Sequence, residues 1–307
     1  MIEKNSDSTN ISIVINTWRS AETLRISLES VKNLGEIVIV DQHSDDETRK
    51  IASEYTEHIY LHPHTKFVEP ARNFAISKAT KEWVLVLDSD EEVPASLAQE
   101  LLKIAQVSST HQKYTHYFIP RKNIIFGKWV RHSGWWPDAR LRFFRSGTVV
   151  WHNTIHGDPP AQGQGHTFPS ELNYAIIHHH YTSVSQWISR MDRYTSIQAG
   201  ELVAKGYQYR FSDNLQKPFS EFLRRFFVWE GYKDGIVGLN LSALQALSEL
   251  VVYLKVYDSQ KPHDLDQKHF NQELKDFFKR SNKEIQHWLL QSKFQSKFEH
   301  ILNKIKL

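Results

Sequence analysis

The spacing of hydrophobic residues divides the chain into regions with different predicted structure. In the first third, short apolar runs alternate with segments in which apolar residues recur every three or four positions. The runs predict β-strands over residues 11–15, 36–40 and 83–87, and the periodic segments predict helices between them. Strands that alternate with helices in this way are typical of a mostly parallel sheet with right-handed crossovers. The first third is therefore predicted to be an α/β structure.

The rest of the chain follows two other patterns. Residues 114–180 show short strand-like segments separated by loops, among them the aromatic loop 133–138 and the alternating segment 140–145. Beyond Thr182 the apolar residues recur at helical spacing. We therefore expect a catalytic domain over residues 1–182 and a helical region over residues 183–307.

Composition narrows the class of protein. The 307 residues are 40% hydrophobic and 12% aromatic, which is enough for a folded core. Thirty-eight basic and 35 acidic side chains give a net charge of +3, too close to balance for a general nucleic-acid binder. The chain has no cysteine, which excludes disulfides, a cysteine nucleophile and cysteine-ligated zinc.

The hydropathy pattern bears on location. The first ten residues are polar, so we expect no signal peptide, and every window of about 18 residues contains a charge, so we expect no transmembrane helix. Residues 236–257 nevertheless leave a wide apolar arc, and residues 261–307 hold ten basic and six acidic side chains. The predicted protein is cytoplasmic. Its helical region either contacts the inner face of the membrane or packs on the catalytic domain or a second subunit.

Polar residues with candidate chemistry follow the predicted strands. Asp88 and Asp90 come directly after strand 83–87, where two carboxylates spaced i, i+2 suit a hard divalent cation. The alternative is an acidic cap for a helix that begins near Pro94. Asp41 ends the second strand and either accepts a hydrogen bond from a nucleotide or holds the amides of its own turn. Arg72 begins a helix, where it either faces a diphosphate or pairs with Glu69.

In order along the chain, residues 13–17, 37–48, 71–73 and 84–90 resemble the nucleotide-sugar half of glycosyltransferase family 2. The resemblance implies a GT-A fold, which is a Rossmann-like, mostly parallel α/β sheet, here followed by the helical region. Later segments resemble the subgroup that contains the lipopolysaccharide-core β-1,4-glucosyltransferases. This extends the resemblance to about residue 258. The segments that carry it are residues 121–123, 126–127, 134–138, 142–145, His156, His178 with Tyr181, and 226–238.

The resemblance implies roles for individual residues. Asn16 and Asp41 would bind the nucleotide sugar, with Asp41 on the base, and Arg72 would contact the nucleotide. Asp88 would hold ribose or a water on the metal, and Asp90 would ligate Mg²⁺ or Mn²⁺.

A late histidine completes the implied metal site. His178 matches the family position, and His180 is the alternative because three histidines are adjacent here. The contrary interpretation is a strand end whose histidines simply alternate in exposure.

The sequence differs from the subgroup at the position of the general base. The subgroup usually carries His-Glu, with the glutamate as base, where this chain has His156-Gly157. An inverting transfer needs a carboxylate to deprotonate the acceptor hydroxyl. Asp158 and Asp138 are the two candidates, and Asp138 could instead fix Arg140 or Arg142 by an ion pair.

The aromatic loop supplies a predicted acceptor site. Trp135 and Trp136 suit stacking on a sugar ring, or else they anchor the loop, and Arg131 suits a phosphate on the acceptor. The predicted enzyme is a metal-dependent inverting hexosyltransferase. It moves a sugar, glucose by resemblance, from a UDP-sugar to a glycan or glycolipid of the cell envelope. A non-catalytic relative that binds sugar nucleotide is the alternative, because Gly157 replaces the usual glutamate.

Overall fold

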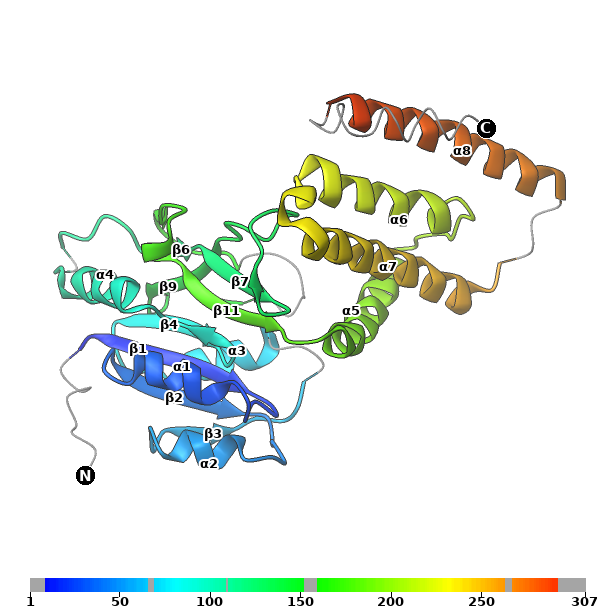
Figure 1. Cartoon of the computed structure of the whole chain (residues 1–307). Coiled ribbons are helices and arrows are strands. Elements are labelled where there is room, and N and C mark those ends of the chain that lie inside the picture. Colours follow the sequence, from blue (N-terminus) through cyan, green and yellow to red (C-terminus); the bar gives the residue numbers. More distant parts are fainter. Residues whose placement is uncertain (1–8, 66–68, 109, 152–158, 263–266, 292–307) are drawn as a thin grey trace. The chain divides into compact units, whose positions relative to one another are not determined.

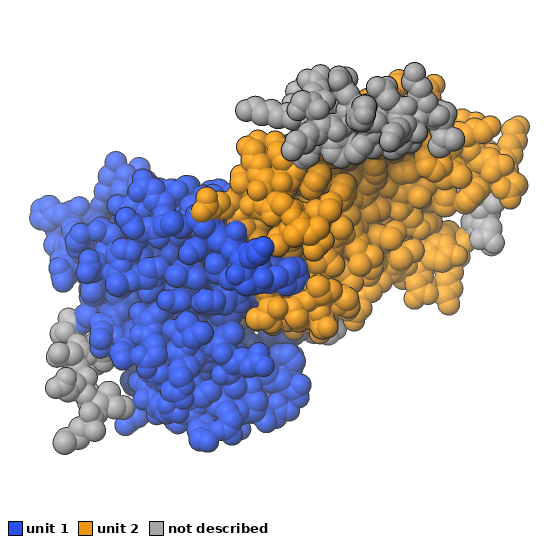
Figure 2. All heavy atoms as spheres, in the orientation of Figure 1, with its two compact units in different colours: residues 1–129, 135–180 blue, residues 130–134, 181–307 orange. Residues whose placement is uncertain are grey.

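The structure is a computed structural model that describes residues 9–65, 69–108, 110–151, 159–262 and 267–291 (Figure 1). It separates into two compact units, shown in different colours in Figure 2. The first unit comprises residues 1–129 and 135–180, and the second comprises residues 130–134 and 181–307.

The first unit is built on a seven-stranded sheet with the strand order β10-β6-β9-β4-β1-β2-β3. Four strands run parallel: β1 (Ile11–Thr17), β2 (Glu36–Asp41), β3 (Ile59–Leu61) and β4 (Trp83–Asp88). The other three extend the sheet beyond β4: β9 (Arg140–Arg145), β6 (His116–Ile119) and β10 (Gly165–Thr167). Because β9 is antiparallel to both β4 and β6, the sheet is mixed but parallel at its centre.

Both faces of the central strands are buried, which explains their unbroken apolar sequence. The helices of this unit are α1 (Leu24–Val31), α2 (Thr48–Ser53), α3 (Glu69–Ile76) and α4 (Ala95–Gln106). On one face Ile13 and Leu85 pack with Leu28 of α1 and Leu97 of α4. On the other face the alternate strand residues, such as Val14 and Val86, pack with Ala75 of α3.

A second, four-stranded sheet lies in the same unit, with the order β5-β11-β7-β8. Its strands are β5 (Glu91–Glu92), β11 (Ile176–Tyr181), β7 (Arg121–Ile125) and β8 (Lys128–Trp129). β5 follows β4 after a two-residue turn, and His178 of β11 pairs with Glu91. The second sheet therefore brings the late histidines beside the end of β4.

The second unit is helical. It contains α5 (Val184–Ala204), α6 (Asp213–Leu223), α7 (Gly235–Gln260) and α8 (Gln267–Gln291), with short helical turns at Arg224–Val228 and Gly231–Asp234 between α6 and α7. α7 packs against both α5 and α6. A Cβ at Gly238 would lie 1.8 Å from the carbonyl oxygen of Gly231, so this close approach requires glycine.

The predicted fold class is confirmed: a mostly parallel α/β sheet is followed by helices. The predicted helical region continues through α8 to Gln291, and residues 292–307 lie outside the described part. The expectation of no membrane-spanning segment stays a prediction. Among the described residues, the helix Gly231–Gln260 is long and apolar enough to cross a membrane by length and composition, with a hydropathy of 1.5 and 28% of its most apolar window buried.

Candidate active site

The register of the parallel strands gathers the predicted nucleotide-binding residues at one edge of the sheet. Asn16 on β1 pairs with Asp88 on β4, and Thr17 pairs with Asp41 on β2. All of these positions are at carboxyl ends of strands, which is where α/β sheets bind ligands. The Oδ1 atom of Asn16 is buried and has no hydrogen-bond partner among the described residues. Such an atom is one that a bound ligand would satisfy.

Asp88 is held by two arginines. Its Oδ1 accepts a hydrogen bond from Arg72 at 2.7 Å, and its Oδ2 accepts one from Arg142 at 2.5 Å. Burial alone would raise the pKa of Asp88, but the charges of Arg142 and Arg72 hold it well below the ordinary value, so the carboxylate is ionised. Asp88 is thus not a helix cap, and Arg72 forms its ion pair with Asp88.

Arg142 connects this pair to a second buried carboxylate. Its Nη2 also donates to Oε1 of Glu91 at 2.6 Å, and Glu91 is fully buried. Glu91 accepts in addition from the Asp88 backbone N–H at 3.0 Å and from Arg121 at 3.3 Å. The end of β4 is therefore held by ion pairs in which the carboxylates of Asp88 and Glu91 alternate with arginine side chains.

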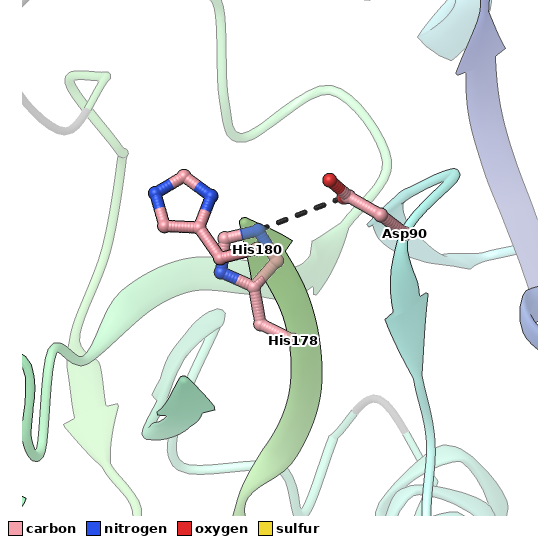
Figure 3. A group of neighbouring side chains, drawn as sticks. All are labelled: Asp90, His178 and His180. Carbon is pink, nitrogen blue, oxygen red and sulfur yellow. Dashed lines mark ion pairs between the residues drawn. The ribbon is translucent and has the colours of Figure 1, made fainter. Parts of the chain in front are cut away.

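The three predicted metal ligands lie together, as Figure 3 shows. Asp90, His178 and His180 each offer one ligand atom, and these atoms are within 4.8 Å of one another. Nε2 of His178 is 3.6 Å from Oδ1 of Asp90. The two histidines are two positions apart on β11, so both face the same side of the strand, and their rings stack at 4.3 Å. His179 points elsewhere and contacts Glu92 at 3.2 Å.

The sequence left open which histidine would meet a metal, and the structure brings both into reach. One carboxylate oxygen and two imidazole nitrogens make a donor set that suits a divalent transition ion such as Mn²⁺ better than Mg²⁺, which prefers oxygen ligands throughout. The residues present therefore fit a divalent metal, with Mn²⁺ favoured of the two predicted ions.

Asp41 makes the contacts of a turn aspartate. Its carboxylate is fully buried and accepts hydrogen bonds from the Ser44 backbone N–H at 2.8 Å, the Ser44 hydroxyl at 2.6 Å and the Thr17 hydroxyl at 2.9 Å. These bonds fix the loop after β2. A contact of Asp41 with a nucleotide base stays a prediction.

The aromatic loop lies partly beside the metal ligands. The ring of Trp135 is 5.5 Å from that of His180, and the ring of Trp136 is 5.5 Å from that of Trp129. Trp135 thus lies beside the metal group and Trp136 packs on Trp129, and the acceptor-binding roles of both stay predictions. Arg131 belongs to the second unit, where its backbone N–H donates to Asp234 at 3.1 Å. Its role toward an acceptor stays a prediction.

Asp138 is engaged by ion pairs. Its carboxylate lies 2.6 Å from Arg121 and 2.9 Å from Arg140, and it accepts a hydrogen bond from Asn123 at 3.0 Å. Burial alone would raise the pKa of Asp138, but Arg121 and Arg140 lower it. A carboxylate with a lowered pKa is a weak proton acceptor. The other candidate base, Asp158, lies outside the described residues.

Sequence reasoning assigned no role to Glu91, Arg121 or Asn123, and it named Arg142 only as a partner for Asp138. Arg142 pairs instead with Asp88 and Glu91, whereas Asp138 pairs with Arg140 and Arg121. A signal was available for Arg142, since an arginine inside an apolar strand is typical of a buried ion pair. The sequence of the strand does not show which carboxylates pair with Arg142, because Asp88 and Glu91 precede it by more than fifty residues.

Comparison with known proteins supports the family resemblance. Residues 12–160 match the family model "Glycosyl transferase family 2". An uncharacterized glycosyltransferase of Rickettsia typhi is 28% identical over 259 residues, covering 78% of this chain and 87% of that protein. The lipopolysaccharide core biosynthesis glycosyltransferase LpsC of Rhizobium meliloti is 23% identical over 239 residues, covering 75% and 85%.

A solved structure, that of residues 1–349 of TarS from S. aureus in complex with UDP, aligns with a TM-score of 0.39 and 14% identity, covering 84% of this chain and 94% of that one. The family match agrees with the expected GT-A class of the mostly parallel sheet. Residues 12–160 thus match glycosyl transferase family 2, and the relatives that align with about three quarters of this chain are glycosyltransferases.

Proposed function

We propose that the protein is a metal-dependent, inverting glycosyltransferase. It transfers a sugar, glucose by family resemblance, from a UDP-sugar to a hydroxyl group of a glycan or glycolipid such as the lipopolysaccharide core. The observation that carries the proposal is the group formed by Asp90, His178 and His180 next to the Arg72–Asp88 ion pair. The similarity to LpsC, a lipopolysaccharide core biosynthesis glycosyltransferase that aligns over most of its length, supports the acceptor class.

The donor half of the site follows from its contacts. Asp90, His178 and His180 would hold the metal, which when bound supplies positive charge that stabilises the departing nucleoside diphosphate. The unpartnered Oδ1 of Asn16 would accept a hydrogen bond from the nucleoside. Asp88 orients the guanidinium of Arg72 for the nucleotide, and its own charge is secured by Arg142.

The acceptor half rests on Trp135 and a carboxylate. Trp135 would stack on the acceptor sugar beside the metal group, with Trp136 supporting the loop. A contact of Arg131, in the second unit, with a phosphate of an anionic acceptor stays a prediction. Because Asp138 is bound by two arginines, we assign the general base to Asp158. Asp158 would then take the proton of the acceptor hydroxyl as that oxygen attacks the anomeric carbon.

The exposed surface of α7 supports a proposal for where in the cell the protein acts. Ile236, Leu247 and Leu254 are large apolar side chains that are exposed on this helix. We propose a cytoplasmic enzyme that contacts the inner face of the membrane through this surface, which would bring it to a lipid-linked acceptor. A second copy of the chain is the other partner that such a surface would suit.

The function is tested by release of nucleoside diphosphate from a panel of UDP-, GDP- and dTDP-sugars. The purified protein is incubated with Mn²⁺, with and without EDTA, and with a lipopolysaccharide-core acceptor. Release of UDP from one sugar that requires both Mn²⁺ and acceptor is the expected result. Failure to bind any sugar nucleotide would contradict the proposal.

A second candidate is a non-catalytic relative that binds sugar nucleotide. Gly157, at the position where the subgroup carries glutamate, favours it. Stoichiometric binding of UDP-sugar without turnover, across all acceptors tried, would support this alternative over the transferase.

A further inference from the structure

One side chain outside the ligand group contacts His178 directly. Asn123 lies on β7 and is fully buried. Its Oδ1 lies 2.7 Å from Nδ1 of His178. Its Nδ2 donates to the Trp135 carbonyl oxygen at 2.7 Å and to Oδ2 of Asp138 at 3.0 Å. Asn123 thus links the metal group to the aromatic loop and to Asp138.

These contacts determine which way the amide of Asn123 faces. The Trp135 carbonyl and the ionised Asp138 carboxylate are acceptors only, so the group that meets them must be the NH₂. The oxygen of the amide therefore faces His178. Because this oxygen can only accept, Nδ1 of His178 must carry the hydrogen of the bond between them.

The tautomer of His178 follows. A neutral imidazole carries one hydrogen, so with Nδ1 protonated the lone pair is on Nε2. Nε2 is the atom that lies 3.6 Å from Asp90. A histidine can ligate a metal only through an unprotonated nitrogen, and metal ligands are usually oriented by a hydrogen bond from the other ring nitrogen.

We infer that Asn123, anchored by Asp138, is a positioning residue that holds His178 in its Nδ1–H tautomer with Nε2 presented to the metal. Asp138 is held in turn by ion pairs with Arg121 and Arg140. This assigns Asp138 to the metal side of the site, where it acts through Asn123. The inference rests on the proposed function only in that the ligand of Nε2 is the divalent metal.

The tautomer is measured first on the unaltered protein. Long-range ¹H–¹⁵N correlation of histidine-labelled, metal-free protein, with His178 assigned by the H178Q variant, reports which ring nitrogen carries hydrogen. The expected result is protonated Nδ1 and unprotonated Nε2. Protonated Nε2 as the main neutral form would overturn the inference, whatever the enzyme does.

The second measurement tests whether Asn123 sets metal affinity. In Asn123→Leu, which keeps the approximate size and removes the hydrogen bonds, Mn²⁺ binding in the presence of UDP is expected to weaken about 10–100-fold. UDP binding in EDTA is expected to stay unchanged. Asn240→Leu, at an exposed position on α7, is the matched control and should change neither.

The outcomes separate the two claims. Unchanged Mn²⁺ affinity in Asn123→Leu, with a wild type that binds Mn²⁺ and UDP, overturns the positioning role and leaves the transferase proposal standing. A wild type that binds neither overturns the proposed function, and the tautomer of His178 then still decides the structural claim. If Asn123→Leu does not fold, Asn123→Ala takes its place with the same expected weakening of Mn²⁺ binding, and unchanged affinity in it overturns the positioning role.

Discussion

Replacing Arg142 by methionine should destabilise the first unit strongly at neutral pH. The Arg142 side chain is only 4% exposed, and its Nη2 bonds to both Asp88 and Glu91. Methionine fills similar space but leaves both carboxylates without their main partner, and Glu91 is fully buried. Removing one partner of a buried ion pair costs about 3–5 kcal/mol, because the remaining charge is left uncompensated.

The expected loss of about 3–5 kcal/mol agrees with the distances from Arg142 to its two carboxylates. At 4 Å a pair of unit charges is worth about 4 kcal/mol in an effective dielectric of about 20, and both Arg142 contacts are shorter than that. The desolvation of the guanidinium, which the variant avoids, offsets part of this gain. A loss of about 3–5 kcal/mol corresponds to a fall in Tm of about 6–20 °C for a unit of this size.

The pH dependence has a definite sign. The folded-state pKa of Asp88 lies below its unfolded value because of Arg142 and Arg72, which outweigh the effect of burial. A lowered folded pKa contributes stability above the unfolded pKa of about 3.9, and this contribution is lost as the pH falls toward the folded value. The stability gap between wild type and Arg142→Met should therefore be widest near neutral pH and should narrow below about pH 4.

Urea unfolding at neutral and acidic pH measures this gap. Arg145→Met is the control, since Arg145 lies on the same strand but pairs with Glu82 at a partly exposed position, which should cost no more than about 1 kcal/mol. Equal losses in the two variants, or a gap that widens in acid, would refute the buried-network account.

Three further outcomes follow from single contacts. Trp135→Ala should raise the KM for acceptor and leave UDP affinity unchanged, which steady-state kinetics and calorimetry would show; a change in UDP affinity alone would contradict its placement. Gly238→Ala should lower the Tm of the second unit because its Cβ would meet the Gly231 carbonyl, whereas Gly200→Ala, with open space around it in α5, should stabilise by up to about 1 kcal/mol. Mn²⁺ should support donor binding at lower concentration than Mg²⁺, and the reverse order in a titration would argue against histidine ligands.

The sequence was most informative where strands are continuous and parallel. The apolar runs located β1, β2 and β4, and the rule that ligands bind at carboxyl ends of strands singled out Asp41, Asp88 and Asp90. Their grouping follows because parallel strands end at the same edge of the sheet. That His178 and His180 would both lie beside Asp90 could not be predicted from sequence, because it depends on which face of β11 meets Asp90.

The supporting contacts could not be predicted in the same way. Asn123 and Arg142 come from β7 and β9, and their partners are distant in sequence. Pairing across such distances is set by antiparallel register and by the second sheet, which short polar segments do not reveal. Residues 130–134 also group with the helical unit, where Asp234 accepts from the backbone N–H groups of Arg131 and His132, although in sequence they lie between two segments of the first unit.

Binding of Mn²⁺ in the presence of UDP tests the central claim most directly. Electron paramagnetic resonance of free Mn²⁺ would be followed during titration of the wild type and of Asp90→Asn, His178→Gln and His180→Gln. The account predicts UDP-dependent uptake of one Mn²⁺ per chain in the wild type and much weaker uptake in each variant. Uptake that is absent in the wild type, or equal in all four proteins, would contradict a metal site at Asp90, His178 and His180.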